Sequence, residues 1–235
     1  PSLFSNKAEQ EFIFGDSDSG KSYFAMYLAG RLAESGVNVL YADWEFSSGE
    51  HKRRLARLFA PMPRNLHYIK CDNSLRHETE HLSDIIVKQR CHYIICDSIG
   101  FAVEGPAESQ EGASAYFRYL RQLNVGSLSI SHIPKQYDNS RDAEIFGSVY
   151  FKAGARSTWF IERAKEAPRD ELHFGLYQRK NNIGAREQPR AFRLRFDNHR
   201  TFVERMDPAS SDELSAAMPL VQRMKMALAD HPMTV

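Results

Sequence analysis

The octapeptide Gly15–Ser22, GDSDSGKS, carries the residue types that bind phosphate. It matches the pattern Gly-x-x-x-x-Gly-Lys-Ser in full, and a short apolar stretch precedes it. In this pattern the glycines let the backbone wrap tightly, so that amide groups point at the phosphates of a nucleotide. Lys21 then reaches the β- and γ-phosphates, and the Ser22 hydroxyl binds Mg²⁺. We therefore predict a nucleotide-binding loop, with a glycine-rich turn that caps a helix as the alternative.

The whole loop and the residue after it are candidate contacts to the nucleotide: Gly15, Asp16, Ser17, Asp18, Ser19, Gly20, Lys21, Ser22 and Tyr23. Asp16 and Asp18 bring negative charge to a site for a polyanion. We expect both carboxylates to point away from the nucleotide, because side chains at these positions project outward while the amides converge on the ligand. Solvent screens the repulsion that remains, so the two acids are expected to weaken binding only modestly.

A further acid, Asp97, ends the apolar run Tyr93–Cys96 (YIIC). An apolar strand that ends in aspartate is the arrangement in which a carboxylate holds Mg²⁺ through its water shell. Strands also end in aspartate as a turn or a helix cap, so this signal depends on the phosphate loop. With Ser22, Asp97 makes up a predicted metal site.

Hydrolysis of a phosphate bond also needs a group that orients or deprotonates water, and Glu45 is the candidate. It lies just past the strand that follows the helix of the phosphate loop. Parallel sheets place their ligand chemistry at this edge. Asp43 is the rival, as a structural residue or a ribose contact, and a solvated loop glutamate is the alternative for Glu45.

Composition narrows the class of protein. The chain has 235 residues, 42% of them hydrophobic and 26% charged, which is typical of a soluble globular protein. Its net charge of +1 says nothing about a polyanionic partner. The three cysteines form no C-x-x-C pair, which indicates reduced thiols and a cytoplasmic location. No apolar run approaches the roughly 18 residues of a membrane span, so we expect no membrane partner.

Short apolar strands alternate with amphipathic helices through the first part of the chain. We expect strands at 12–14, 37–44, 66–69, 93–96 and 127–131, and helices at 21–35, 48–59, 78–89 and 111–123. Four more strands are expected in a row, at 157–162, 172–179, 191–196 and 201–205. This order predicts an α/β fold in which helices flank a central parallel sheet and antiparallel strands are added at one edge.

Six segments in this order resemble the RecA-like P-loop ATPases, and within them the DnaB-like hexameric helicases and the RepA-like ATPases of plasmids and phages. The segments are GDSDSGKS, LYADWEFSSGEHKRRLARL, YIICDSIGF, SLSISHIPK, IFGSVYFKAGARSTW and QRKNNIG, between Phe12 and about Arg205. The resemblance implies ATP and Mg²⁺ as cofactors, a homo-oligomer of hexameric form, single-stranded DNA as partner and a bacterial, plasmid or phage context.

The resemblance also implies roles for single residues. Glu45 takes the place of the catalytic glutamate after the second strand. Ser131 and His132 fall where the family has a polar sensor of the γ-phosphate, and a buried histidine with a backbone partner is the alternative for His132. The strand ending at His132 is implied to lie between the strand of the phosphate loop and the strand of Asp97.

In QRKNNIG, Lys180 or Arg179 takes the place of a cation that reaches into the nucleotide of the neighbouring subunit. The spacing departs from the family, because Gln178 stands where its lysine would be if Lys180 replaces its arginine. Alternation along a strand would point Arg179 differently from Lys180. A solvated basic turn is the alternative for this segment.

Two loops are implied to line the central channel of the ring. The loop 102–112 carries three glutamates and is a poor phosphate binder by itself. The loop 134–147 offers Lys135, Tyr137 and Arg141 for contacts to the nucleic-acid backbone and for base stacking. Three acids in the second loop offset that charge, so its support for DNA binding rests mostly on the resemblance.

We interpret residues 1–207 as a RecA-like ATPase domain and 208–235 as a linker and a helix, expected over 211–231. The segment 218–235 resembles the first helix of a winged helix-turn-helix and the start of the next helix, and a helix that packs on the core or on a neighbour is the alternative. The function implied is a Mg²⁺-dependent ATPase that acts as a ring-forming DNA helicase or DNA-translocating motor in replication or repair. The alternatives are a nucleotide-switched, DNA-binding regulatory ATPase without unwinding and a small-molecule phosphotransferase, which would need a mobile lid rich in arginine.

Overall fold

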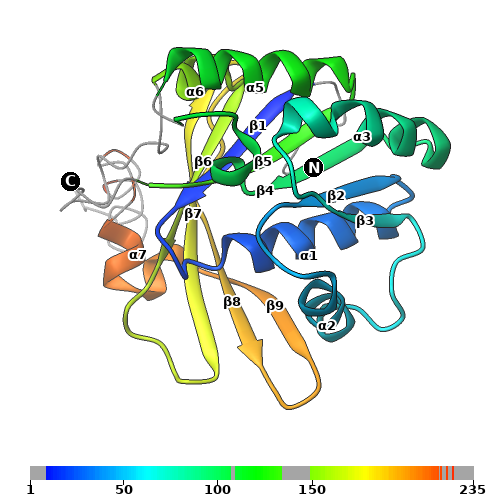
Figure 1. The fold of residues 1–235 in the computed structure, drawn as a ribbon. Helices are drawn as coiled ribbons and strands as arrows, with labels where there is room; N and C mark the ends of the chain where they lie inside the picture. The colour runs from blue at the N-terminus through cyan, green and yellow to red at the C-terminus, as the bar shows by residue number, and fades with distance from the viewer. Residues whose placement is uncertain are drawn as a thin grey trace.

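The computed structural model describes residues 9–106, 109–133 and 149–216, together with residues 218, 221 and 224. Within these residues the chain forms one nine-stranded sheet with helices on both faces (Figure 1). The strand order is β3-β2-β4-β5-β1-β6-β7-β8-β9. The first six strands are parallel to one another, and the last three are antiparallel. The predicted α/β fold is therefore confirmed, including the antiparallel strands at one edge.

The strands follow the apolar runs of the sequence. The parallel strands are β1 (Gln10–Gly15), β2 (Val39–Asp43), β3 (Leu66–Lys70), β4 (Tyr93–Asp97), β5 (Gly126–His132) and β6 (Ser157–Arg163), and the antiparallel strands are β7 (Glu171–Asn181), β8 (Arg190–Phe196) and β9 (Thr201–Met206). Strands buried on both faces read as continuous apolar runs. In β4, for example, Ile94 packs into the core on one face of the sheet and Ile95 into the core on the other. The strand β5, which ends at His132, lies between β4 and β1, as the resemblance implied.

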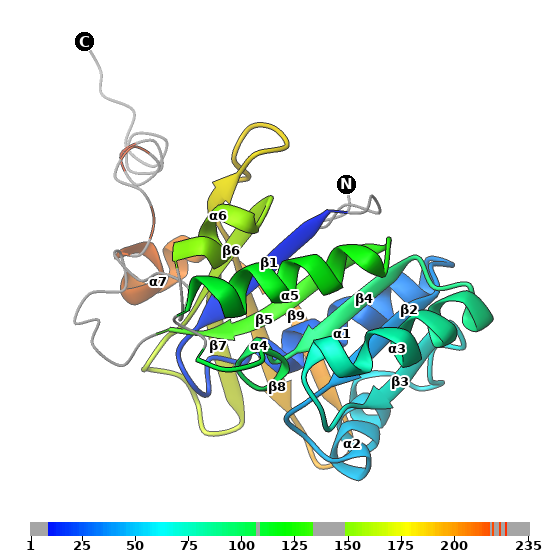
Figure 2. The ribbon, with the colours of Figure 1, turned by 45° about the horizontal axis from the view of Figure 1, so that its top comes forward.

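Helices cover the two faces of the parallel sheet unequally (Figures 1 and 2). On one face lie α1 (Lys21–Glu34) and α2 (Ser48–Leu58), and on the other lie α3 (Leu75–Gln89), α5 (Gln110–Gln122) and α6 (Val149–Gly154). The helices α4 (Ile99–Ala102) and α6 were not expected, because elements this short show no helical periodicity. In the described part of the chain, no helix is long and apolar enough to cross a membrane.

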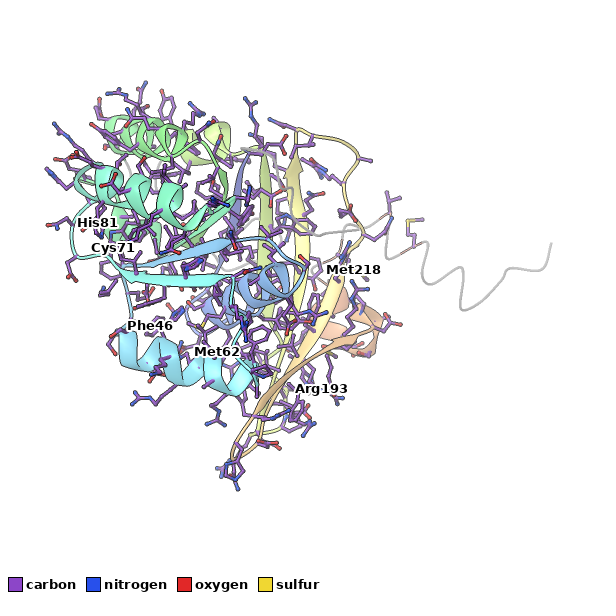
Figure 3. All side chains as sticks on the ribbon, turned by 90° about the vertical axis from the view of Figure 1, so that its right-hand side faces the viewer. Phe46, Met62, Cys71, His81, Arg193 and Met218 are labelled. Carbon is purple, nitrogen blue, oxygen red and sulfur yellow. The ribbon has the colours of Figure 1, made fainter. Side chains whose placement is uncertain are left out.

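The antiparallel strands extend the sheet beyond the helices and pack one face on α1. Phe24 of α1 lies 5.3 Å from the ring of Phe174 and 4.9 Å from that of Phe192. The opposite face carries charged side chains, among them Arg193, which is labelled in Figure 3. Arg193 donates to Glu204 at 2.6 Å. This extension places the turn between β8 and β9 beside α1 and α2, where it bears on the site described below.

The described segment 208–216 lies against the sheet. A 3-10 helix, η2 (Pro208–Ser210), leads into α7 (Asp212–Ala216). Leu214 of α7 is fully buried, and its carbonyl accepts a hydrogen bond of 2.6 Å from the Tyr177 hydroxyl. Of the helix expected over 211–231, the structure describes α7 up to Ala216, a bend at Met218 and helical residues at Val221 and Met224. Most of the segment that resembles a winged-helix module lies outside the described residues.

Candidate functional site

Five strand ends meet at one edge of the parallel sheet. Gly15, Asp43, Asp97, His132 and Arg163 are the last residues of β1, β2, β4, β5 and β6. Gly15 pairs with His132, and Asp43 pairs with Asp97. Parallel strands bring their carboxyl ends to a common edge, so residues far apart in sequence become neighbours here.

The two glycines of the phosphate loop are required by its geometry. A Cβ atom on Gly15 would lie 2.3 Å from the carbonyl oxygen of Ile161, on the neighbouring strand β6. Gly20 has a φ of 88°, in the left-handed region that favours glycine, and α1 begins directly after it. The loop therefore turns sharply between β1 and α1, as the motif predicts.

Lys21 closes the loop on itself. Its ammonium group donates to the carbonyl oxygens of Gly15 at 3.1 Å and Asp16 at 2.5 Å. Burial lowers the pKa of Lys21 to about 8, and the nearby Asp97 and Glu45 carboxylates partly oppose that shift. A buried ammonium group held by backbone carbonyls is well placed to exchange those partners for phosphate oxygens.

The loop aspartates differ in position. Asp16 is exposed, and its carboxylate accepts the backbone amide of Ser17 at 2.8 Å, so it folds back on its own loop. Asp18 is also exposed but lies on the wall of the site cavity, with a φ of 58°. Its outward orientation remains a prediction.

Asp97 is fully buried, and its two carboxylate oxygens differ in their hydrogen bonds. The Tyr41 hydroxyl donates to its Oδ2 at 2.7 Å, whereas Oδ1 is buried and has no hydrogen-bond partner among the described residues. Burial raises the pKa of Asp97 to about 7, against the effect of the Tyr41 and Ser22 hydroxyls. A buried carboxylate oxygen without a partner is costly unless a cation or proton meets it.

These residues fit Mg²⁺. The ion binds oxygen ligands and is commonly held by one or two carboxylates together with nucleotide phosphates, rather than by a cage of protein groups. The unpaired Oδ1 of Asp97 and the neighbouring Ser22 hydroxyl are oxygen donors of this kind. Among the residues that the structure describes, no group of three or more His, Cys, Asp or Glu side chains gathers as a separate metal site.

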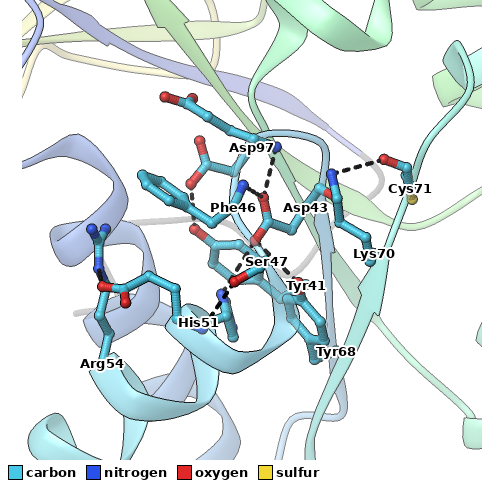
Figure 4. A network of polar contacts seen from close by, with 12 residues as sticks. Tyr41, Asp43, Phe46, Ser47, His51, Arg54, Tyr68, Lys70, Cys71 and Asp97 are labelled. Carbon is cyan, nitrogen blue, oxygen red and sulfur yellow. Dashed lines mark hydrogen bonds and ion pairs between the residues drawn. The ribbon is translucent and has the colours of Figure 1, made fainter.

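Glu45 lies in a turn that Asp43 holds, and Figure 4 shows Asp43 with its other partners Phe46 and Tyr68. Asp43 Oδ1 accepts the backbone amides of Glu45 and Phe46, each at 2.9 Å, and the Tyr68 hydroxyl donates to Oδ2 at 3.2 Å. Asp43 is fully buried, while Glu45 is exposed on the cavity wall. Of the two roles considered for Asp43, the structural one accounts for these three hydrogen bonds.

A cavity of about 470 Å³ opens at this edge. It brings together Lys21, Ser22, Tyr23, Glu45 and His132, all of which were predicted as site residues. Burial lowers the pKa of His132, and the Lys21 ammonium adds to that effect, so the imidazole is held neutral near Lys21. The arrangement places a cation, a glutamate and a neutral imidazole around one space.

Further residues of the cavity were not found from the sequence. Arg163 ends β6, and its guanidinium group donates to the carbonyl oxygen of Asp18 at 3.4 Å. Phe46, Arg54, Leu172 and Phe196 also line the cavity. The basic face of the helix expected at 48–59 was the one available signal for Arg54. The sequence gives no indication of Leu172 and Phe196 as cavity residues, because they reach the cavity only when β7 and β8 pack against α1.

The two candidates for a cation acting on a neighbouring subunit lie far from this cavity. Leu172, near the start of β7, lines the cavity, and Lys180 lies near the other end of the strand. At about 3.3 Å per residue the two are roughly 25 Å apart. Neither Lys180 nor the adjacent Arg179 lies at the cavity of its own chain.

Both side chains also have contacts within the chain. The Lys180 ammonium group donates to three backbone carbonyls at the end of α6, those of Lys152 at 2.7 Å, Ala153 at 3.1 Å and Ala155 at 2.7 Å. The guanidinium of Arg179 lies 5.0 Å from the centre of the Phe160 ring and 5.7 Å from that of Tyr177. The ladder between β6 and β7 shifts its register at this point, so Arg179 occupies a bulge.

The predicted contacts to nucleic acid, Lys135, Tyr137 and Arg141, lie outside the described residues. So does most of the loop that carries them. These assignments stay predictions.

Comparison with solved structures identifies the fold. The chain is similar to a KaiC-like protein from the hyperthermophilic archaeon Pyrococcus horikoshii OT3, with a TM-score of 0.64 and 12% sequence identity over 84% of this chain and 90% of that chain. The likeness supports the RecA-like fold predicted from the sequence. No protein-family model and no curated protein matches the chain.

This structural similarity does not identify the activity of the chain. Among the solved structures, 507 chains match this one. A fold that is shared so widely hosts many different functions. At 12% identity the likeness concerns the fold alone. The closer relation to DnaB-like and RepA-like proteins therefore stays a prediction.

Proposed function

We propose that this chain is a Mg²⁺-dependent ATPase that assembles into a ring and moves along or unwinds DNA. One observation supports the enzymatic part: Lys21, Ser22 and Glu45 line a single cavity, and the buried Asp97 carboxyl, whose Oδ1 has no partner among the described residues, is near enough to the Ser22 hydroxyl for it to lower the pKa of Asp97. A phosphate loop, a metal-binding acid and an acid for water activation are the recurring parts of nucleotide hydrolysis.

Each residue has a separate task in this proposal. The loop amides and Lys21 bind the β- and γ-phosphates, and Lys21 leaves its carbonyl partners to do so. Glu45 accepts a hydrogen bond from the attacking water and orients it in line with the γ-phosphate. His132, at the end of β5, contacts the γ-phosphate side of the cavity as a neutral donor. Ser22 and Asp97 would hold Mg²⁺, which when bound neutralises developing charge on the phosphate oxygens.

The ring-forming part is supported by the position of the cations on β7. A positive charge aimed at the transferring phosphate accelerates hydrolysis strongly. Lys180 and Arg179 lie at the end of β7 remote from the cavity of their own chain, so either serves such a site only in a neighbouring subunit. Their contacts within one chain would then be exchanged on assembly. DNA as the partner rests on the resemblance and on the three residues proposed to contact it, Lys135, Tyr137 and Arg141.

The test combines turnover with oligomer mass. We expect Mg²⁺-dependent ATP hydrolysis that single-stranded DNA stimulates, and a hexamer in the presence of a non-hydrolysable ATP analogue. Glu45→Gln should retain nucleotide binding and lose turnover by about 100-fold or more. Glu80→Gln, on the exposed surface of α3, is the matched control and should leave turnover unchanged.

The outcomes separate the alternatives. Absence of Mg²⁺-dependent hydrolysis would overturn the ATPase proposal. Tight nucleotide binding with slow turnover and no stimulation by DNA would favour a nucleotide-switched regulator instead. Unchanged turnover in Glu45→Gln would remove Glu45 from the catalytic role.

A further inference from the structure

The cavity has an aromatic side that the phosphate chemistry leaves unused. Tyr23 of α1, Phe46 before α2, Arg54 of α2 and Phe196 of β8 all line it. The guanidinium carbon of Arg54 lies 4.2 Å from the centre of the Phe46 ring and 4.9 Å from that of Tyr23. The Tyr23 and Phe196 rings meet edge to face, with their centres 5.4 Å apart. We call these four residues the stacking platform.

Ion pairs and hydrogen bonds fix the platform in place. Arg54 Nε donates to Glu50 Oε1, one turn earlier in α2, at 2.8 Å. Arg57, on the next turn of α2, donates to the carbonyl oxygen of Asp197, which directly follows Phe196. Helix α2 is thereby tied to the turn between β8 and β9. Arg54 is thereby held in the cavity wall beside the Phe46 and Tyr23 rings.

We infer that the stacking platform binds the nucleobase of the substrate, an inference that rests on the proposed nucleotide site. Tyr23 is two residues beyond Lys21 on α1, so a nucleotide whose phosphates meet Lys21 has its base within reach of the platform. Rings and guanidinium groups attract the flat π-surface of a base, and such stacking tolerates different bases.

The same chemistry predicts the selectivity of the site. The platform contacts the faces of a base through three rings and one guanidinium, and hydrogen-bond readout of base edges is what discriminates sharply between bases. Purines therefore bind more tightly than pyrimidines because their stacking area is larger. Adenine and guanine nucleotides bind with similar affinity, within about tenfold of each other.

The experiment compares nucleotides with a ligand that lacks the base. Dissociation constants are measured by calorimetry with Mg²⁺ for ATP, GTP, CTP and inorganic tripolyphosphate. Arg54→Ala and Tyr23→Ala should weaken ATP and GTP binding by about 5- to 150-fold, the range for loss of one stacking contact. Tripolyphosphate binding should change by less than about twofold, because it does not reach the platform. Tyr23→Phe, which keeps the ring, should bind ATP like the wild type.

Arg53 supplies the matched control. It also pairs with Glu50, at 2.5 Å, but its side chain is 75% exposed. Arg53→Ala should leave the affinity for every ligand unchanged, and thermal melting of all variants verifies folding. Equal losses for ATP and tripolyphosphate in Arg54→Ala would overturn the inference, as would unchanged ATP binding in both Arg54→Ala and Tyr23→Ala. If the wild type binds neither ATP nor tripolyphosphate, the proposed nucleotide site itself is wrong.

Discussion

Asp43 accepts the backbone amide of Glu45 through its Oδ1 atom at 2.9 Å. The acceptor is fully buried in the sheet edge, and the residue it holds is exposed on the cavity wall. The same oxygen accepts the amide of Phe46, so one carboxylate fixes both residues that follow β2 in the cavity. The placement of the proposed catalytic acid thus depends on a second acid that does not line the cavity.

Asp43→Ala should lower turnover of ATP by about 10- to 100-fold, because small displacements of a catalytic group cost rate on this scale. Nucleotide affinity should change little, since Lys21 and the loop amides are untouched. Steady-state kinetics and calorimetry measure the two quantities separately. Asp43→Asn keeps an oxygen acceptor for the two amides and should recover most of the turnover. Equal turnover in wild type and Asp43→Ala would show that the turn holds Glu45 without this carboxylate.

Tyr41→Phe should destabilise the protein in the absence of Mg²⁺ by about 1–3 kcal/mol, the range for a buried polar group that loses its partner. The Tyr41 hydroxyl is the donor to Asp97 Oδ2, at 2.7 Å, and both residues are fully buried. Urea unfolding with and without Mg²⁺-nucleotide measures the effect. Tyr119→Phe, at a half-buried tyrosine of α5, is the control. A loss of stability no larger than that of the control would contradict the contact.

Much of this site follows from local sequence and one topological rule. The phosphate loop is a contiguous motif, and Glu45 and Asp97 each follow an apolar run. Because these runs form parallel strands, their carboxyl ends meet, and the sequence order of strands and helices was enough to predict that edge. Asp43 and Asp97 pair at the ends of β2 and β4, as expected for neighbouring parallel strands.

The remaining features depend on side-chain orientation and on contacts distant in sequence. Asp43 and Glu45 are both acids after the same strand, and only the structure shows that one turns inward to the backbone while the other faces the cavity. Phe196 reaches Tyr23 because β8 packs on α1, a contact between residues with no common motif. The short helix α6 offers too few residues for a periodic signal, although it engages Lys180.

Lys180→Met should lower the free energy of unfolding by about 1–2 kcal/mol, because three carbonyls near the end of α6 lose a charged donor while the alkyl stem remains. Mixing this variant with Lys21→Ala protomers tests the proposed role across the subunit boundary. A shared site should restore part of the ATPase activity in the mixture, and the same mixture with Arg179→Met separates the two cations. No recovery with either variant would argue against a cation acting in trans.

His51 should make the stability of the protein pH-dependent in mildly acidic solution. Its side chain is 1% exposed and lies between the rings of Tyr41 and Tyr68, with centres 4.5 and 4.1 Å away. Its Nδ1 lies 3.6 Å from Asp43 Oδ2, too far for a hydrogen bond, and both ring nitrogens lack a partner in the described part of the chain. Burial lowers the pKa of His51 from 6.5 to about 4.

The sign of the effect follows from proton uptake. Between pH 6.5 and about 4 the unfolded chain protonates His51 while the folded chain does not, so stability falls as the pH falls through this window. The loss amounts to at most about 3 kcal/mol. The Asp43 and Asp97 carboxyls act in the opposite sense, because burial raises the pKa of both and the folded chain takes up those protons first. Both acids are present in wild type and in His51→Phe, which keeps a ring between the two tyrosines, so the comparison isolates His51: on acidification from pH 7 to 4 the wild type should lose more stability, or gain less, than His51→Phe in chemical unfolding. Identical changes in stability would mean that His51 takes up its proton equally in both states.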